Sequence, residues 1–490
     1  MQNIPRPYLI TILIALVSLS PLMFSHADLW DGTLAEMAIL SGDYSIIDYW
    51  VTSHGWYMSY YGYLAFDHLA QLTGIPWKAF INALIVISLL GLARETFLFL
   101  REQFELEHDY ALIGSWAILT FPIWHNLTST AIFVNVFCLW VFMGAVRQWY
   151  SNKFLSIALF AVSAQLFSLF SLAVGFGVCE FILSATRENG KKLFIRLFIF
   201  SALLLAAFIA FKAMVNMHGR SGEYNTLTSD ALQYLYPLIG YCIALVGVGF
   251  LLQARLKDSG EAGRFFRLFL AIAALLFFAV LPYVAVGRPV RFFSFGSFGS
   301  RHALLTCIPL SFLLAVATQY VGRHVNARAA MWGSAFVLLA SMVLLHQGYS
   351  HKAAALVFKD MLTRSFEEIP APPSGYVAIR VEGAEPPRHV HNYEINMCLY
   401  KAYGKSAWMA NGYWRRNMKL NPASLKELYG DSKGAPMCKD VTGDAYSEYV
   451  FSLSNYAQEG RFWYWYYYLA SEYSAFNPTL TPVDFIHEKQ

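Results

Sequence analysis

Two carboxylates follow the first apolar run of the chain at close spacing. Asp28 and Asp31 come a few residues after the stretch 8–24, which is long enough for one membrane-spanning helix. A carboxylate held at the lipid–water boundary could act as a general base and take a proton from an attacking hydroxyl group. The plainer alternative is that Asp31 only caps a short helix.

These two aspartates open an acid-rich segment, residues 25–78, which we call the acidic segment. It holds six carboxylates and, apart from Lys78 at its end, no basic residue. Residues 31–42 predict a short helix along the membrane surface, with an apolar stripe and a glycine at its end. Such a helix would hold Asp28 and Asp31 at the mouth of a helical bundle.

A second polar segment, residues 287–302, is rich in arginine, glycine and serine, and we call it the basic segment. Its arginines lie on the predicted exterior side of the membrane, where the positive-inside rule leaves few basic residues. Cationic side chains and glycine-flanked backbone N–H groups are suited to bind a phosphate. The alternative is that they bind ordinary lipid headgroups or acids near the C-terminus. The residues concerned are Arg288, Arg291, Arg301 and His302.

Membrane helices must position both segments. Of the 490 residues, 57% are apolar and 14% are charged, which excludes an ordinary soluble protein. The stretch 154–185 is too long for one crossing and is expected to divide near Ser168–Ser171. With nine further apolar runs this predicts about 11 transmembrane helices and a cytoplasmic N-terminus. The runs centre on residues 8–24, 79–100, 110–124, 131–146, 194–214, 231–253, 266–286, 303–320 and 331–347.

Charge divides the chain into a membrane body, residues 1–347, and a tail, residues 348–490. The tail carries 15 basic and 15 acidic residues, and the body carries 21 and 17, an excess too small to favour a nucleic-acid partner. The tail predicts a small α/β domain on the exterior side. Its aromatic run, 462–468, could be a sugar-stacking platform, an interfacial belt or a buried strand. The expected tail elements are a helix at 352–364, a strand at 376–381 and a helix at 393–403.

Cysteine positions bear on the compartment. Cys398 and Cys438 are the two cysteines of the tail, and we expect them to form a disulfide because the exterior is oxidising. The first apolar run could also be a signal peptide cleaved after Ser25-His26-Ala27. Cleavage would leave the orientation of the remaining helices unchanged.

The acidic segment carries a longer pattern. It reads Asp28-x-x-Asp31-Gly-x-x-Ala35-Glu36-Met37-x-x-x-Ser41-Gly42-Asp43, followed by His54-Gly-Trp56-Tyr57-x-x-Tyr-Tyr. Together with the helix order, this pattern resembles the first periplasmic loop of the glycosyltransferase C (GT-C) superfamily, in the branch of the protein mannosyltransferases, the lipid A aminoarabinose transferase and the O-antigen glucosyltransferases. The likeness covers the layout of the chain, residues 28–65 and, more weakly, residues 287–302.

This resemblance implies a glycosyltransferase of the bacterial inner membrane. It would move a hexose from a polyprenyl-phosphate donor to a periplasmic glycan or glycolipid such as O-antigen or lipopolysaccharide. Asp31 would be the catalytic base with Asp28 assisting, and no cofactor is required. Many members carry a second acid where this chain has Asn135, so a bridging Mg²⁺ or Mn²⁺ stays open. Arg288, Arg291, Arg301 and His302 would bind the donor phosphate, and Glu36, His54, Trp56 and Tyr57 the substrate.

Two other functions stay open. One is an O-antigen polymerase or ligase of the same fold that uses a diphosphate-linked lipid donor. The other is a non-enzymatic transporter, although the chain shows no internal repeat. The sequon Asn126-Leu127-Thr128 leaves a eukaryotic endoplasmic reticulum open beside the bacterial membrane.

Overall fold

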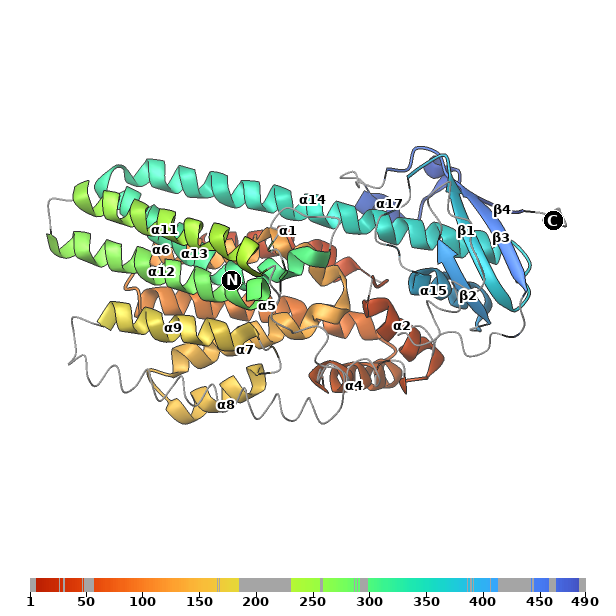
Figure 1. Cartoon of the computed structure of the whole chain (residues 1–490), viewed down its shortest axis with the longest axis horizontal. Helices are drawn as coiled ribbons and strands as arrows, with labels where there is room; N and C mark the ends of the chain where they lie inside the picture. The colour runs from red at the N-terminus through yellow and green to blue at the C-terminus, as the bar shows by residue number, and fades with distance from the viewer. Residues whose placement is uncertain are drawn as a thin grey trace.

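A computed structural model gives the fold for most of the chain. It describes residues 6–25, 27–29, 31–45, 47, 57–164, 166, 168–184, 231–255, 259–285, 287, 288, 290, 298–385, 387, 390, 392–405, 407–412, 442, 445–457 and 464–483. This part consists mostly of helices, which form an elongated bundle, with a small sheet at one end (Figure 1).

Among the described helices, six are long and apolar enough to cross a membrane. They are α5 (Trp77–Glu102), α7 (Phe133–Gln148) with the 3-10 turn before it, α11 (Ala231–Arg255), α12 (Ser259–Ala285), α13 (Cys307–His324) with the 3-10 turn before it, and α14 (Ala327–Glu367). The described part is therefore that of a helical membrane protein.

The predicted number of about 11 spans is not confirmed. The run 8–24 forms a shorter helix, α1 (Arg6–Phe24). The run 110–124 forms α6 (His108–Leu119), which ends before Pro122 and is followed by a 3-10 turn. The stretch 154–185 divides into two helices, α8 (Lys153–Ser163) and α9 (Ser168–Ser184), but the division lies before the predicted break at Ser168–Ser171, which is the first turn of α9. The run 194–214 lies outside the described residues.

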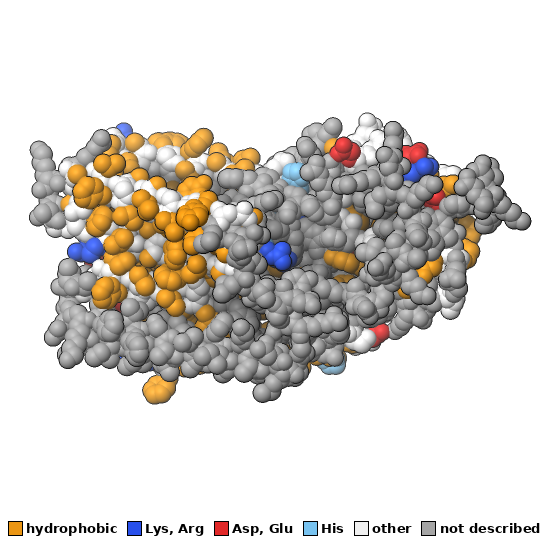
Figure 2. Space-filling model, viewed as in Figure 1, with side chains coloured by type: hydrophobic (Ala, Val, Ile, Leu, Met, Phe, Trp, Pro, Cys, Tyr) orange, Lys and Arg blue, Asp and Glu red, His pale blue; other side chains and the backbone are white. Residues whose placement is uncertain are grey.

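Apolar side chains face outward on the helices at one side of the bundle. Figure 2 shows them gathered where α11, α12 and α14 lie in Figure 1. Large side chains such as Tyr236, Phe250, Trp332 and Phe336 are well exposed there. Exposed apolar surface of this extent is suited to contact lipid chains. Inside the bundle the packing is dense, with Phe99 stacked on Phe312 at 5.4 Å between ring centroids.

Helix α14 joins the bundle to the tail without a break (Figure 1). The expected run 331–347 and the expected helix 352–364 belong to this single helix, so the predicted domain boundary at residue 347 falls inside it. Its second half is buried, and it packs against the tail, whereas its first half is largely exposed. The helix continues because the change in composition at residue 347 introduces no helix-breaking proline. The proline-rich connector comes later, from Pro370.

The tail is a small mixed α/β unit. Its sheet has the strand order β2-β1-β3-β4, in which β1 runs parallel to β2 and β3, and β4 runs antiparallel to β3. The expected strand 376–381 and helix 393–403 are both present. The elements are β1 (Gly375–Glu382), α15 (Asn392–Tyr403), β2 (Trp408–Gly412), β3 (Tyr446–Ser452), α17 (Tyr464–Ala470), the 3-10 turn η5 (Ser474–Phe476) and β4 (Thr479–Pro482).

Two expectations for the tail differ from the structure. The described part of the aromatic run is the helix α17 and not a strand, and Tyr464 and Tyr468 are buried in its packing, so these two rings cannot stack on a sugar. Cys398 is a free thiol in the structure and does not form the predicted disulfide there. Cys398 is buried on the inner face of α15, 1% exposed, and its thiol donates to the Glu394 carbonyl at 3.2 Å. Cys438 lies outside the described residues.

Candidate active site

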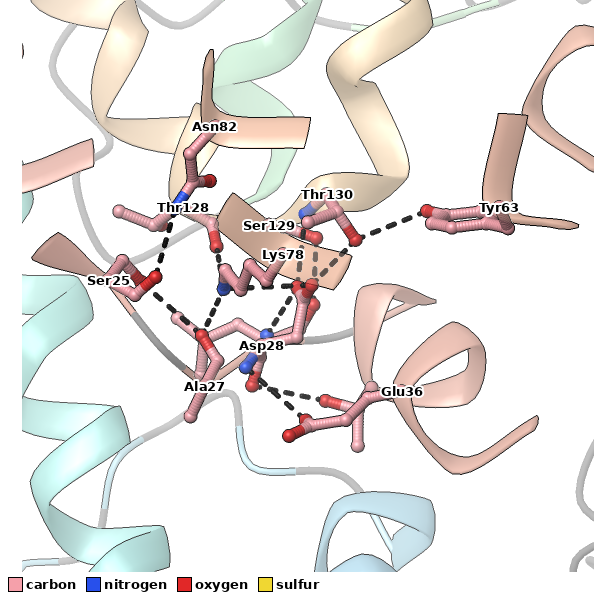
Figure 3. A network of polar contacts seen from close by, with 12 residues as sticks. Ser25, Ala27, Asp28, Glu36, Tyr63, Lys78, Asn82, Thr128, Ser129 and Thr130 are labelled. Atoms are coloured by element: carbon pink, nitrogen blue, oxygen red, sulfur yellow. Dashed lines mark hydrogen bonds and ion pairs between the residues drawn. The ribbon is translucent and has the colours of Figure 1, made fainter. Parts of the chain in front are cut away.

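The side chain of Asp28 lies fully buried in the turn between α1 and α2 (Asp31–Ser41). Its Oδ1 accepts hydrogen bonds from the backbone N–H groups of Leu29 (2.8 Å) and Thr130 (3.0 Å), and its Oδ2 accepts one from Thr130 Oγ1 (2.6 Å; Figure 3). A Cβ atom on Gly32 would lie 2.0 Å from Oδ1. Glycine at position 32 therefore makes room for this carboxylate.

Lys78 supplies the opposite charge. It is the second residue of α5, and its Nζ lies 3.6 Å from Asp28 Oδ2, with both side chains buried. The same ammonium donates hydrogen bonds to the carbonyls of Ala27 and Thr128. One turn further along α5, Asn82 Nδ2 donates to the Ser25 carbonyl at 3.0 Å. Helix α5 thus holds the turn 25–29 through main-chain and charged contacts together (Figure 3).

The tail holds the other side of the acidic segment. Lys359 of α14 donates to the Asp28 carbonyl at 2.8 Å and to Thr33 Oγ1 at 2.9 Å. Glu36 pairs with Lys401 of α15 at 2.7 Å. Burial alone would raise the pKa of Glu36, but the nearby ammonium groups, Lys401 foremost, lower it below its ordinary value. By the same pairing, the pKa of Lys401 is raised although burial opposes this.

A short linking segment, residues 122–132, connects the acidic and basic segments. It consists of two 3-10 turns, η1 (Pro122–Thr128) and η2 (Thr130–Ile132). On one side, Ser129 Oγ donates to the Leu29 carbonyl at 2.7 Å. On the other side, Asn126 Nδ2 donates to Ser300 Oγ at 2.8 Å. Ser300 belongs to the turn η3 (Phe298–Thr306), so both segments meet at one end of the bundle.

The basic segment is described in part. Arg288 is exposed just after α12, and its backbone N–H donates to the Tyr283 carbonyl at 2.8 Å. Arg301 and His302 lie in η3 and are half-buried, with the His302 ring 5.0 Å from that of Tyr283. Arg291 lies outside the described residues.

Of the other predicted site residues, the structure describes some side chains and not others. Asp31 is the first residue of α2, and its side chain lies outside the described part, as do His54 and Trp56. Tyr57 begins the helix α4 (Tyr57–Thr73) and is half-buried. The expected helix after Asp31 is present and ends at Gly42, whose φ is +68°. Its apolar stripe packs into the bundle core.

The acids that the structure describes in the acidic segment all have polar partners. The sequence indicated an excess of acid without salt-bridge partners. For Asp28 and Glu36 this is wrong, because Lys78 and Lys401 pair with them. Asp43 accepts from Ser45 Oγ at 2.6 Å, and Asp67 accepts from Gln71 Nε2 at 2.8 Å and from Tyr44. For Asp28 and Glu36 the partners come from distant parts of the chain, which a scan for local charge pairs cannot find.

Sequence reasoning overlooked the partners of the acids in this cluster, among them Lys78, Thr130 and Lys359. Lys78 did give a signal, because it is the one basic residue of the acidic segment. Thr130 and Lys359 gave none. The sequon residue Asn126 is fully buried and hydrogen-bonded, so a glycan could not be attached there in the folded chain.

No group of three or more His, Cys, Asp or Glu side chains is placed to hold a metal ion within the described ranges. No family model, curated protein or solved structure matches this chain.

Proposed function

We propose that this protein is an integral-membrane glycosyltransferase of the GT-C type. It transfers a hexose from a polyprenyl-phosphate donor to a periplasmic glycan or glycolipid, such as O-antigen or lipopolysaccharide. In this proposal the chain spans a bacterial inner membrane about 11 times, and the tail is periplasmic. One observation carries most weight: the linking segment bonds to Leu29 on one side and to Ser300 on the other. An acid-bearing turn and an arginine-bearing turn are thereby held at the same end of the bundle.

The reaction needs both turns. The acceptor hydroxyl attacks the anomeric carbon, a carboxylate takes the hydroxyl proton, and the bond from the anomeric carbon to the phosphate oxygen breaks. Polyprenyl phosphate leaves with the bonding electron pair and gains negative charge. Arginine side chains stabilise that charge, a role we assign to Arg288, Arg291 and Arg301, with His302 beside them.

We prefer Asp31 as the base because the nearby carboxylates of Asp28 and Glu36 are already paired with lysines. The carboxylate of Asp28 accepts three hydrogen bonds and faces an ammonium, so proton transfer to it would break a buried, satisfied arrangement. Glu36 is similarly paired with Lys401. We therefore assign Asp28 to holding the turn and Asp31, three residues later, to taking the proton.

Transfer by reconstituted protein tests the proposal. Purified protein in liposomes would receive labelled polyprenyl-phosphate hexoses and glycolipid from cells lacking the gene. Asp31→Asn should lower turnover by about 10²-fold or more, the range usual for a general base, while Asp43→Asn should leave it unchanged. Unchanged turnover in Asp31→Asn would remove Asp31 from the mechanism.

The same assay separates the alternatives. Transfer of whole saccharide units from diphosphate-linked donors alone would identify a polymerase or ligase. Movement of a labelled solute without any transfer would identify a transporter.

A further inference from the structure

Lys359 is a buried lysine of the tail that contacts the acidic segment. It lies on the buried second half of α14, and its side chain is almost fully enclosed. Its Nζ reaches the acidic segment at two points, the Asp28 carbonyl (2.8 Å) and Thr33 Oγ1 (2.9 Å). A third contact, to Glu394 Oε1 of α15 at 3.3 Å, stays within the tail.

The two contacts on the acidic segment flank Asp31 in sequence. Asp28 lies three residues before it and Thr33 two residues after it. Thr33 Oγ1 also donates to the Asp28 carbonyl at 3.3 Å. The Lys359 ammonium and the Thr33 hydroxyl therefore link the two ends of the turn 28–33. An ammonium has three protons to donate, and the three contacts use all of them.

The other end of Lys359 is fixed by the tail. Glu394 is fully buried and supplies the opposite charge. The neighbouring residues of α14, Phe358 and Met361, belong to the apolar core that the tail sheet shares with this helix. The folded tail thus fixes the ammonium against the turn, on the side away from the contacts that α5 makes.

We propose that Lys359 is a positioning residue that fixes the turn 28–33, and with it Asp31, to the tail. This inference rests on the proposed function, because it matters for catalysis only if the turn carries the base. It gives the tail a role in the reaction apart from any contact with the acceptor. A base must be held close to its productive position, and a displacement of about 1 Å can cost roughly 10²-fold in rate.

A pair of variants isolates this contact. Lys359→Met alone would remove an ammonium from beside the buried Glu394 carboxylate. The test therefore uses the double variant Lys359→Met/Glu394→Gln and compares it with Glu394→Gln, so that the two proteins differ only in the lysine. Lys405→Met, an exposed lysine over Trp408, is the unrelated control. Thr33→Val keeps the side-chain shape and all charges, and serves if the double variant does not fold.

Two measurements are made on full-length protein in detergent or liposomes. Hydrogen exchange over residues 28–41 should be roughly tenfold faster or more in the double variant than in Glu394→Gln, and unchanged in Lys405→Met. Turnover should fall roughly tenfold or more, with KM for the polyprenyl-phosphate donor within about twofold, because the donor contacts are intact. Thr33→Val should also give faster hydrogen exchange over residues 28–41 and lower turnover, but with smaller changes than the double variant.

Unchanged exchange over residues 28–41 would overturn the inference. Faster exchange with unchanged turnover would also overturn it, because the contact would then be structural only. If wild-type protein transfers no sugar from any donor, the proposed function fails. The exchange data would still decide whether Lys359 holds the turn.

Discussion

The two ends of the helical bundle use charge in different ways. At the tail end, Asp28 and Lys78 are paired with side-chain exposures of 0% and 3%. At the opposite end, Arg323 bonds to Glu107 at 2.7 Å and to Glu261 at 2.9 Å, with 33% of its own side chain exposed and 53% of that of Glu107. The opposite end joins the ends of α12 and α13 to Glu107 before α6, whereas the tail end joins the turn after α1 to α5 and, through Lys359, to the tail.

The contrast indicates what each kind of pair contributes. A partly exposed pair is screened by water and salt, and contributes little to stability. A buried pair costs desolvation energy to form, but leaving one partner alone costs more. We therefore expect loss of the Asp28–Lys78 pair to cost much more stability than loss of the Arg323 pairs.

The largest effect is expected for Asp28→Ala. The variant leaves the Lys78 ammonium buried without its counter-charge and should lower the free energy of unfolding by about 3–5 kcal/mol. Arg323→Ala at the opposite end should cost about 0–1 kcal/mol, and less at high salt. Thermal unfolding in detergent at low and high salt measures both, and equal losses would contradict the contrast.

A smaller effect is expected from one added methyl group. Gly32→Ala would place a Cβ atom against Asp28 Oδ1, and displacing the carboxylate should cost about 1–3 kcal/mol. Gly333→Ala is the matched control, because that glycine lies inside α14 with no atom within 4 Å of the added Cβ. It should stabilise the protein by up to about 1 kcal/mol through helix propensity. Effects of the same sign at both sites would argue against the tight fit at Gly32.

The smallest effect concerns the pH dependence of the Glu36–Lys401 pair. The folded-state pKa of Glu36 lies below its ordinary 4.5, so its contribution is present above pH 4.5 and is lost as pH falls through the lowered pKa. The folded-state pKa of Lys401 lies above its ordinary 10.5, so the stability that Lys401 contributes is lost only as pH rises through the raised pKa. Between these limits the free energy of unfolding of the wild type should therefore be about 1 kcal/mol higher than that of Glu36→Gln. This difference should disappear as the pH falls below the lowered pKa of Glu36. A difference in unfolding temperature that persists at pH 2 would refute this.

Helix positions were largely predictable because hydrophobic length is a local property. The runs that became α5, α7, α12 and α13 could be read from the sequence without knowing their neighbours. The two elements expected on either side of residue 347 form one helix for a related reason. Composition changes there, but a helix ends where its backbone pattern is broken, and nothing breaks it before Glu367.

The candidate site was predictable only as a list of residue types. Asp28, Asp31 and Glu36 stood out because acids are scarce in the body. The contacts around these acids could not be predicted, because the contact residues are far away in the sequence. Thr130 lies 102 residues from Asp28, and Lys359 lies 331 residues from it. Burial and charge pairing at that separation depend on how the helices and the tail pack.

By itself, the sequence determined the membrane character, the apolar helices, the short helix after Asp31 and the strand and helix of the tail, because hydrophobicity, capping and strand patterns act within a few residues. The tertiary structure alone decided that Asp28 is buried against Lys78, that Asn126 is enclosed beside Ser300 and that Lys359 reaches the turn before α2. These are contacts between distant residues, and they form because buried polar and charged groups, once removed from water, need partners that only the packed chain brings to them.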